Sequence, residues 1–407
     1  MQHSQSRESF AGKPHSTHYL PLDSIRGIAA FSVVIHHFVI SKVMIAEFTH
    51  KAWIDYPFFH NAWIFVDLFF VLSGIVISLN YAKSDFGNFS FKDFLARRLA
   101  RIYPLHVVTL AAMVALRFGK MILVSTGVVA LAPSAADVNT VYSFVLNLLL
   151  LHSMGFLNHL SWNGPSWSIS TEFYTYILFA ALLVCSRRIN STRFFWLSSV
   201  ALVVACWVVI VTILGNGSLD FHYDYGFLRC VMSFFIGVLT LKFVRSLPPI
   251  SSMTGPAILQ LGSLFVSLLL VSIVGTYPGV SFVAPFAFAM LLGSLMAFPM
   301  ARPLPSLLST WPLVWLGKRS YSIYLTHAVV LVVAEYAVQL AGARPISFLD
   351  GLVPGLAASI SLLLLAVAVL GISALSYEFV ELRGGRLLLR VLKQKNSSSA
   401  AVAARVG

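Results

Sequence analysis

Ionisable side chains stand inside long apolar stretches of this chain, where they are costly unless they serve a function. The first stretch opens with Asp23 and Arg26 and contains His36 and His37. On a helix Arg26 and His37 would share a face, with His37 roughly 16 Å further along the axis. A basic anchor and a buried general base fit this arrangement. The alternative for His37 is a core histidine bonded to a neighbouring helix, and for His36 this structural role is favoured.

A pair of arginines, Arg98 and Arg101, opens the third apolar stretch. Residues three apart lie on one face of a helix, and guanidinium groups bind phosphate in a bidentate manner. Together with Arg26 they would form a site for a phosphorylated donor at one membrane surface. The alternative is a positive cluster that only sets membrane topology, which is at least as good an account of Arg97.

Two carboxylates also lie in apolar surroundings. Asp67 would either pair with a buried cation or cap its helix near the outer interface. Glu172 lies about two turns into a helix that we expect to enter from the outer side. A lone buried carboxylate tends to protonate, so Glu172 should have a partner or a catalytic task, with structural pairing to Arg or His as the alternative. Ser73 and Gly74 are small residues that favour close helix packing.

Two later groups are expected to be structural. His327, about two turns into the tenth apolar stretch, should bond an acceptor or tyrosine hydroxyls, and Glu381, at the end of the last one, should pair with Arg98 or Arg101. No cluster of His, Cys, Asp or Glu has the spacing of metal ligands, so the sequence predicts no metal site.

The composition indicates which kind of protein holds these ionisable groups. Of the 407 residues 58% are hydrophobic and 11% charged, whereas soluble domains are about half apolar and about a quarter charged. This excludes a cytosolic enzyme, a nucleic-acid-binding domain and a disordered chain. The net charge of +13 comes from basic residues clustered at loop ends, as the positive-inside rule requires. The lipid bilayer, and not nucleic acid, is therefore the expected partner.

Eleven apolar stretches divide the chain. They span residues 25–45, 61–81, 102–131, 139–155, 166–185, 194–214, 227–245, 257–275, 280–300, 320–340 and 352–380. If segment 139–155 does not cross the membrane, every basic cluster falls on the cytoplasmic side. We therefore predict an all-α polytopic membrane protein, a bundle of ten transmembrane helices plus one re-entrant or interfacial segment, with both termini cytoplasmic. A break of the 102–131 stretch around Gly119 is the alternative.

Taken together, the motifs resemble the membrane acyltransferase-3 family, whose members acylate, usually acetylate, bacterial surface sugars and some small molecules. Six segments occur in the family's order: Leu22-Asp23 and Arg26-Gly27 with His37, Phe69-Phe70-Val71-Leu72-Ser73-Gly74, Arg98-x-x-Arg101, Trp167-Ser168-Ile169-Ser170-Thr171-Glu172, Ser320-Tyr321 with Tyr324-Leu325-Thr326-His327, and Tyr377 with Glu381. Two departures stand out. Ser24 replaces the commoner glycine, and Phe173-Tyr174 replaces a frequent Glu-Gln pair, which puts the acceptor side in doubt.

The resemblance implies roles for individual residues. His37 would be essential for acyl transfer, Arg26, Arg98 and Arg101 would help to hold acyl-coenzyme A, most often acetyl-CoA, and Glu172 matches the family's Trp-Ser-x-Ser-x-Glu carboxylate. Substrate-binding or supporting roles are expected for Asp23, Asp67, Ser73, Trp167, Ser170, Tyr324, His327 and Glu381. The expected organisation is a cytoplasmic N-terminal tail (1–21), an acyltransferase-3-like membrane domain (22–382) and a basic cytoplasmic C-terminal tail (383–407) that frays.

The predicted function is an integral O-acyltransferase of the bacterial cytoplasmic (inner) membrane. It would move an acyl group, most often acetyl, from cytoplasmic acyl-CoA to a hydroxyl of a cell-surface polysaccharide, lipopolysaccharide or glycolipid. His37 would serve as base or transient acyl carrier, and Glu172 would orient His37 or activate the sugar. Some relatives carry an extra extracytoplasmic transferase domain, so this membrane domain would finish the transfer itself or use a separate partner. A homo-oligomer is left open.

Three alternatives remain from the sequence. The acceptor could be a small lipophilic molecule such as a macrolide. The chain could be a proton-coupled secondary transporter that uses His37 and Glu172 as a relay, although the paired repeats typical of transporters are not evident. It could also be a membrane scaffold subunit in which the buried ionisable groups only fix the packing.

Overall fold

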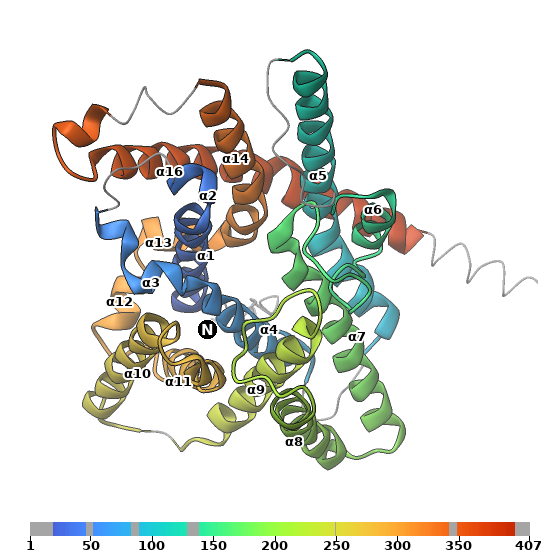
Figure 1. Cartoon of the computed structure of the whole chain (residues 1–407). Coiled ribbons are helices and arrows are strands. Elements are labelled where there is room, and N and C mark those ends of the chain that lie inside the picture. The colour runs from blue at the N-terminus through green and yellow to red at the C-terminus, as the bar shows by residue number, and fades with distance from the viewer. Residues whose placement is uncertain are drawn as a thin grey trace, which may run out of the picture.

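The computed structural model describes residues 19–45, 52–82, 89–127, 138–248, 250–341 and 348–394. Every regular element within these ranges is a helix, and ten of the helices are long and apolar enough to cross a membrane. The prediction of an all-α polytopic membrane protein with ten spanning helices is confirmed. Figure 1 shows α1 and α4 in the middle of the bundle, with the other spanning helices around them.

The spanning runs are formed by α1 (Leu20–Ile40), η2 and α4 (Ala62–Ile64, Phe65–Tyr81), α5 (Phe91–Ser125), η3 and α7 (Gly164–Ser166, Trp167–Arg188), α8 and η4 (Thr192–Val208, Val209–Ile213), α9 (Gly226–Ser246), α10 (Thr254–Ile273), η5 and α11 (Pro278–Phe282, Ala284–Ala297), α14 (Ser320–Ala341), and α16 and η7 (Leu356–Ser376, Tyr377–Gly384). The short elements are α2 (Lys42–Ile45), η1 (Ala52–Asp55), α3 (Pro57–His60), α6 (Val141–Leu148), α12 (Leu304–Leu308), α13 (Trp311–Lys318) and η6 (Phe348–Gly351).

The segment predicted not to cross the membrane forms only the eight-residue helix α6. A capping box between Thr140 and Ser143 starts this helix, because each side chain satisfies a free backbone donor of the other residue. After α6 the chain continues without a regular helix as far as η3. The alternative break at Gly119 is wrong, since α5 runs through this position without interruption.

The stretch 149–163 is anchored at both ends to residues of neighbouring helices. At its beginning the Tyr103 hydroxyl donates to the Leu148 carbonyl at 3.1 Å, and at its end the Asn163 amide donates to the Leu325 carbonyl at 3.1 Å. Tyr103 and Leu325 both lie well inside their own helices. The α7 helix therefore begins inside the bundle and not at its surface.

Helices α4 and α9 approach each other backbone to backbone. A Cβ atom at Gly74 would overlap the carbonyl oxygen of Phe234, and one at Gly237 would overlap the carbonyl oxygen of Val71. Only glycine allows such an approach. The close-packing site predicted at Ser73-Gly74 is confirmed for Gly74.

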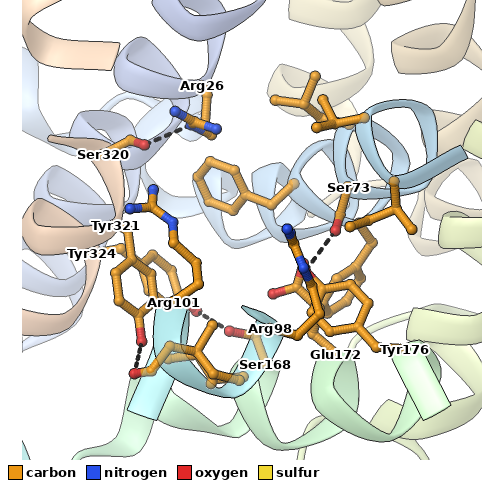
Figure 2. Close-up of a pocket in the computed structure, with 17 residues that line it drawn as sticks. Arg26, Ser73, Arg98, Arg101, Ser168, Glu172, Tyr176, Ser320, Tyr321 and Tyr324 are labelled. Carbon is orange, nitrogen blue, oxygen red and sulfur yellow. Dashed lines mark hydrogen bonds between the residues drawn. The ribbon is translucent and has the colours of Figure 1, made fainter. Parts of the chain in front are cut away.

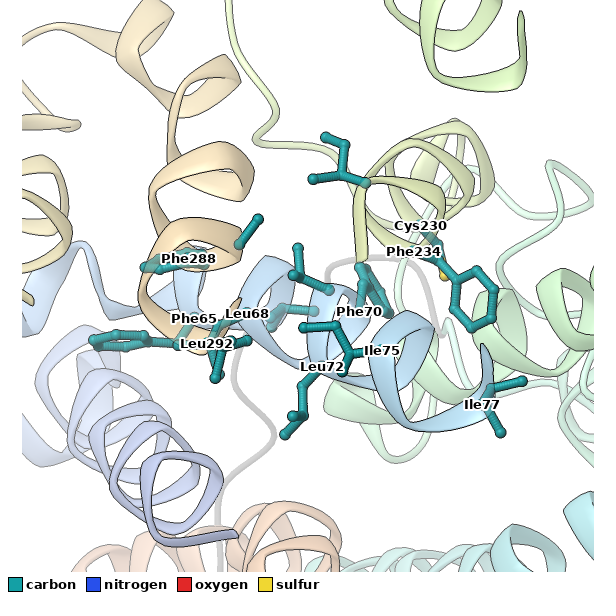
Figure 3. Packing of buried hydrophobic residues seen from close by; sticks show 14 of the residues in the cluster. Phe65, Leu68, Phe70, Leu72, Ile75, Ile77, Cys230, Phe234, Phe288 and Leu292 are labelled. Carbon is teal, nitrogen blue, oxygen red and sulfur yellow. The ribbon is translucent and has the colours of Figure 1, made fainter. Parts of the chain in front are cut away.

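Around this crossing the apolar side chains of α4 pack on two neighbours. Figure 3 shows α4 between α11, which presents Phe288 and Leu292, and α9, which presents Phe234. The rings of Phe65 and Phe288 stack with centroids 5.9 Å apart. This core holds α4 rigidly, and with it the polar residues Asp67 and Ser73.

A second close approach joins α1 to α13. A Cβ atom at Gly27 would meet the backbone of Gly317, and one at Gly317 would overlap the carbonyl of Asp23. Ser24, which replaces the family's commoner glycine, donates to the Leu308 carbonyl at 2.5 Å. These contacts place Arg26 beside the start of α14.

The expected frayed tail from Arg383 is wrong for the residues that the structure describes. The last helical run continues to Gln394, because Gly385 lets it pack against the Ala100 backbone and Lys393 Nζ lies 3.5 Å from Asp93 Oδ1. Residues 1–18 and 395–407, which contain most of the two predicted tails, lie outside the described residues.

Candidate active site

The three predicted arginines line one cavity of about 160 Å³. We call it the arginine cavity. Its polar lining consists of Arg26 from α1, Ser73 from α4, Arg98 and Arg101 from α5, Ser168, Glu172 and Tyr176 from α7, and Ser320, Tyr321 and Tyr324 from α14. Figure 2 shows these side chains converging from helices that are far apart in the sequence. The structure thus brings Arg26, Arg98 and Arg101 together, as the sequence predicted.

Arg26 is fixed by three contacts. Its Nη2 lies 3.1 Å from Asp23 Oδ1 and donates to the Gly317 carbonyl at 3.1 Å, while its Nε donates to Ser320 Oγ at 2.7 Å. The predicted supporting role of Asp23 is therefore to hold the Arg26 side chain.

Arg101 forms an ion pair with Glu381, and Ser322 Oγ donates to the other carboxylate oxygen at 2.7 Å. The Glu381 side chain is fully buried, so the ion pair ties the last helical run to α5. The prediction that Glu381 pairs with Arg98 or Arg101 is confirmed for Arg101.

Arg98 has a different environment. Its guanidinium lies 6.0 Å from the ring centroids of both Phe94 and Tyr176. Its buried Nε has no hydrogen-bond partner among the described residues. A buried donor without a partner is costly, so Arg98 offers a hydrogen-bond donor to a ligand in the arginine cavity.

Glu172 faces the arginine cavity and not His37. The Tyr176 hydroxyl donates to Glu172 Oε1 at 2.5 Å, and Ser73 Oγ lies 2.8 Å from the same hydroxyl. The expectation that Glu172 orients His37 is therefore wrong, since the two residues line different cavities. The reason is that α7 begins inside the bundle, so that two turns of helix bring Glu172 to the level of Ser73.

His37 lines a second cavity of about 460 Å³. We call it the histidine cavity. It is lined by Val33, His36, His37, Ile40, His60, Trp63, Val66, Leu160, Gly164, Pro165, Trp167, Asp220, His222 and Tyr324. The expected structural role of His36 agrees with its Nδ1, which lies 3.2 Å from the Phe59 carbonyl oxygen.

The contacts of His37 assign its tautomer. Its Nδ1 lies 2.9 Å from the Val33 carbonyl oxygen and 3.3 Å from His327 Nε2. A carbonyl oxygen only accepts, so Nδ1 of a neutral His37 bears the proton and Nε2 keeps a free lone pair. His327 Nδ1 likewise lies 3.3 Å from the Ile323 carbonyl oxygen, which leaves its Nε2 as an acceptor for the His37 proton. His37 Nε2 then keeps the lone pair that a base or a nucleophile requires.

His327 is a direct neighbour of His37, which its sequence context did not indicate. We expected it to bond an acceptor or tyrosine hydroxyls, whereas it contacts His37 and packs against the Tyr324 ring at a centroid distance of 5.9 Å. No sequence signal joins two histidines 290 residues apart.

Tyr324 lines both cavities. Its hydroxyl donates to the Pro165 carbonyl at 2.9 Å and accepts from Ser168 Oγ at 3.0 Å, and its ring packs edge to face on Phe69. The predicted supporting residue is thus the partition between the arginine cavity and the histidine cavity.

Asp67 pairs with a buried cation that the sequence analysis missed. Arg229 Nη2 lies 2.7 Å from Asp67 Oδ2, both side chains are 0% exposed, and Ser233 Oγ also donates to Asp67 at 2.9 Å. The capping alternative for Asp67 is therefore wrong. Arg229 stands inside the 227–245 apolar stretch, and the rule that selected the other intramembrane charges would have found it.

The remaining predicted residues support these groups. Trp167 and Trp63 place their rings 5.3 Å and 5.0 Å from the Arg229 guanidinium. Ser170 Oγ donates to the Leu150 carbonyl at 2.6 Å and so anchors the stretch 149–163. Among the described residues, no group of three or more His, Cys, Asp or Glu is placed to hold a metal ion.

Comparison with known proteins gives the family. A family model described as Acyltransferase domain matches residues 20–377. A provisionally named peptidoglycan O-acetyltransferase of Bacillus subtilis is 25% identical over 78% of this chain and 49% of its own length. A provisionally named O-acetyltransferase of Staphylococcus aureus is 27% identical, over 89% and 57%, and a Listeria monocytogenes peptidoglycan O-acetyltransferase is 23% identical, over 80% and 51%.

The chain therefore spans about half the length of these curated relatives. No solved structure matches it. The family model covers most of the chain, including all of the residues that line the two cavities. The chain belongs to the acyltransferase-3 family.

Proposed function

We propose that this protein is a membrane O-acetyltransferase that takes an acetyl group from acetyl-CoA in the arginine cavity and passes it to a hydroxyl in the histidine cavity. The observation that supports this most is the adjacency of the two cavities at Tyr324. A basic cavity suits a phosphate-bearing donor, and a buried imidazole with a free Nε2 suits transfer to a hydroxyl. The names of the relatives agree with this reaction class.

The donor enters from the cytoplasm of a bacterial cell, in whose inner membrane the protein resides. Arg26 and Arg98 both lie in the first turns of their helices, so the arginine cavity is near one end of the bundle. Basic residues mark the cytoplasmic ends of spans, and ten crossings return both termini to that side. The phosphates of acetyl-CoA would engage Arg98 first, since its Nε is the donor without a protein partner.

In the histidine cavity, His37 Nε2 removes the proton of the acceptor hydroxyl as the oxygen attacks the thioester carbonyl. The carbon–sulfur bond then breaks, the thiolate of coenzyme A leaves, and the proton on His37 passes to it. His327 Nε2 accepts from His37 Nδ1, and this contact orients the ring and stabilises the imidazolium. If His37 instead carries the acetyl group, the same Nε2 attacks the thioester, the carbon–sulfur bond breaks and the thiolate of coenzyme A leaves. The acceptor hydroxyl then attacks acetyl-histidine, the carbon–nitrogen bond breaks, and the hydroxyl proton passes to the thiolate.

Glu172 has a role on the donor side in this scheme. Its hydrogen bond from Tyr176 positions a carboxylate beside the arginines and away from the acceptor. We propose that Glu172 orders the arginine cavity before the donor binds.

The test is acetyl transfer from labelled acetyl-CoA to peptidoglycan-derived glycans by the full chain in nanodiscs. His37→Ala should lose about 10²–10⁴-fold in rate, the range expected for a general base, with an unchanged thermal midpoint. His159→Gln is the control, because His159 lines neither cavity. Arg98→Ala should raise KM for acetyl-CoA and leave KM for the acceptor unchanged. Full activity of His37→Ala would refute the proposal, and a burst of labelled His37 before transfer would identify the acyl-carrier route.

A further inference from the structure

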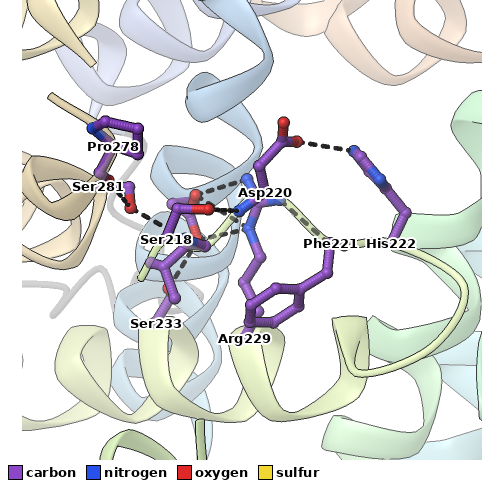
Figure 4. Close-up of polar contacts among 10 residues, drawn as sticks. Ser218, Asp220, Phe221, His222, Arg229, Ser233, Pro278 and Ser281 are labelled. Carbon is purple, nitrogen blue, oxygen red and sulfur yellow. Dashed lines mark hydrogen bonds and ion pairs between the residues drawn. The ribbon is translucent and has the colours of Figure 1, made fainter. Parts of the chain in front are cut away.

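Part of the wall of the histidine cavity comes from the loop between η4 and α9. Leu219 and Phe221 in this loop are buried. The Leu219 backbone N–H donates to Ser281 Oγ at 2.9 Å, and the Phe221 carbonyl accepts from Arg229 at 3.3 Å. The alternate residues Asp220 and His222 line the cavity. Figure 4 shows their side chains facing each other, with Asp220 Oδ1 3.6 Å from His222 Nε2.

The polar lining residues of the histidine cavity are one carboxylate, four histidines, one tyrosine and two tryptophans, and none of its described lining residues is Lys or Arg. Burial, the Arg229 guanidinium and His37 together hold the pKa of His222 down to about 3, so its imidazole is neutral at physiological pH. Neutral imidazoles and a carboxylate bond hydroxyl groups. A ligand carboxylate or phosphate would instead meet the Asp220 carboxylate, with no Lys or Arg among the described lining residues to pair with it.

Aromatic side chains complete this wall. Trp63 and Trp167 both line the cavity, and the Arg229 guanidinium lies over both rings, which fixes their positions. The His222 ring packs edge to face on Trp167 with centroids 5.1 Å apart. Indole rings present apolar surface and a carboxylate presents acceptors. The cavity therefore offers partners both for the apolar C–H face and for the hydroxyl groups of a pyranose ring.

From this lining we propose that the histidine cavity binds an uncharged sugar as the acetyl acceptor, with Asp220 and His222 as specificity-determining residues that hold its hydroxyl groups. The inference rests on the proposed function and makes it more specific. It disfavours acidic or phosphorylated sugars, because of the Asp220 carboxylate, and acceptors with few hydroxyl groups, because the His222 imidazole would lose water without replacement.

The test compares two soluble acceptors of equal length, an N-acetylglucosamine oligosaccharide and an oligogalacturonate, with the full chain in nanodiscs. Wild type should use the uncharged sugar with at least about tenfold lower KM, since one hydrogen bond to a charged group corresponds to about that factor. Asp220→Asn should raise KM for the uncharged sugar about threefold to tenfold and reduce the difference between its KM and that of the acidic sugar. KM for acetyl-CoA should not change. His222→Gln should shift the acceptor KM in the same direction.

Glu378→Gln is the matched control. It also removes one carboxylate charge, but Glu378 is half exposed, lies 4.0 Å from Arg383 and lines neither cavity. Equal acceptor KM values for Asp220→Asn and wild type, or a preference of wild type for oligogalacturonate, would overturn the inference.

Binding of each sugar is also measured without acetyl-CoA, by quenching of indole fluorescence. If wild type binds the uncharged sugar but transfers nothing to it, the proposed function fails, and the effect of Asp220→Asn on binding still decides what the cavity recognises. If neither sugar binds, the inference is refuted even where transfer to another acceptor depends on His37.

Discussion

Removal of the Asp67 charge should destabilise the bundle strongly. Arg229 Nε lies 3.1 Å from both carboxylate oxygens of Asp67 and Nη2 lies 2.7 Å from one of them, and neither side chain is exposed. In Asp67→Asn the guanidinium stays buried without a counter-charge. Breaking a buried pair in this way costs about 3–5 kcal/mol, which corresponds to a factor of more than about 100 in the folding equilibrium.

The assay is thermal denaturation of the full chain in detergent, followed by intrinsic fluorescence, for Asp67→Asn, Arg229→Met and the double variant Asp67→Leu with Arg229→Met. Each single variant leaves one buried charge unpaired, so each should lower the midpoint. The double variant should recover most of the loss, because apolar replacement of a whole buried pair is often neutral. Ser233→Ala, which removes one neutral donor to Asp67, should cost only about 1 kcal/mol.

Two results would refute this reasoning. If Asp67→Asn denatures at the wild-type midpoint, the pair contributes nothing to stability. If the double variant is less stable than both single variants, the loss in the single variants does not come from leaving one buried charge unpaired. The attraction between Asp67 and Arg229 would then itself stabilise the fold.

Three further predictions follow from the fold. Tyr324→Trp should enlarge the side chain between the two cavities and lower acetyl transfer about tenfold. Because Tyr324 also lines the arginine cavity, binding of acetyl-CoA is measured separately by calorimetry, and unchanged transfer would show that nothing passes Tyr324. Gly237→Val should lower the thermal midpoint by the cost of an overpacked crossing, about 1–3 kcal/mol or more, whereas Gly262→Val, with open space around it, should not. Burial and the neighbouring His106 hold the pKa of His152 down to about 3, so the unfolded chain binds this proton first as pH falls. His152 should therefore contribute a loss of stability of about 1.4 kcal/mol per pH unit below about pH 6.5. His152→Asn should make the fall of the thermal midpoint between pH 7 and 5 smaller than in wild type, and an equal fall in both proteins would contradict this.

The spans were predictable because apolar length and basic loop ends act locally along the chain. The same charge argument identified segment 139–155 as the one that does not cross, and the short helix α6 agrees with it. The position of Glu172 was not predictable in this way. The sequence predicts a helix that starts at the outer surface, whereas the contact of Asn163 with Leu325 places the start of α7 against α14.

Contacts between distant helices were also beyond the sequence. Helical geometry predicts that Arg26 and His37 lie on one face of a helix, and α1 runs through both without a break. The same geometry gives no information about which other helix packs against that face. His327 therefore looked structural until the fold placed its Nε2 beside His37 Nδ1. Arg229 is a different case, since an intramembrane arginine is visible in the sequence and only its partner Asp67 needed the structure.

The separation of the two cavities argues against a direct proton relay between His37 and Glu172. A proton relay between His37 and Glu172 would need the two groups in contact or joined by bonded side chains. Glu172 instead accepts from Tyr176 in the arginine cavity, while His37 contacts His327 in the histidine cavity, and Tyr324 lies between the cavities. In the proposed reaction, a group transferred between the two cavities would therefore pass a single side chain, that of Tyr324.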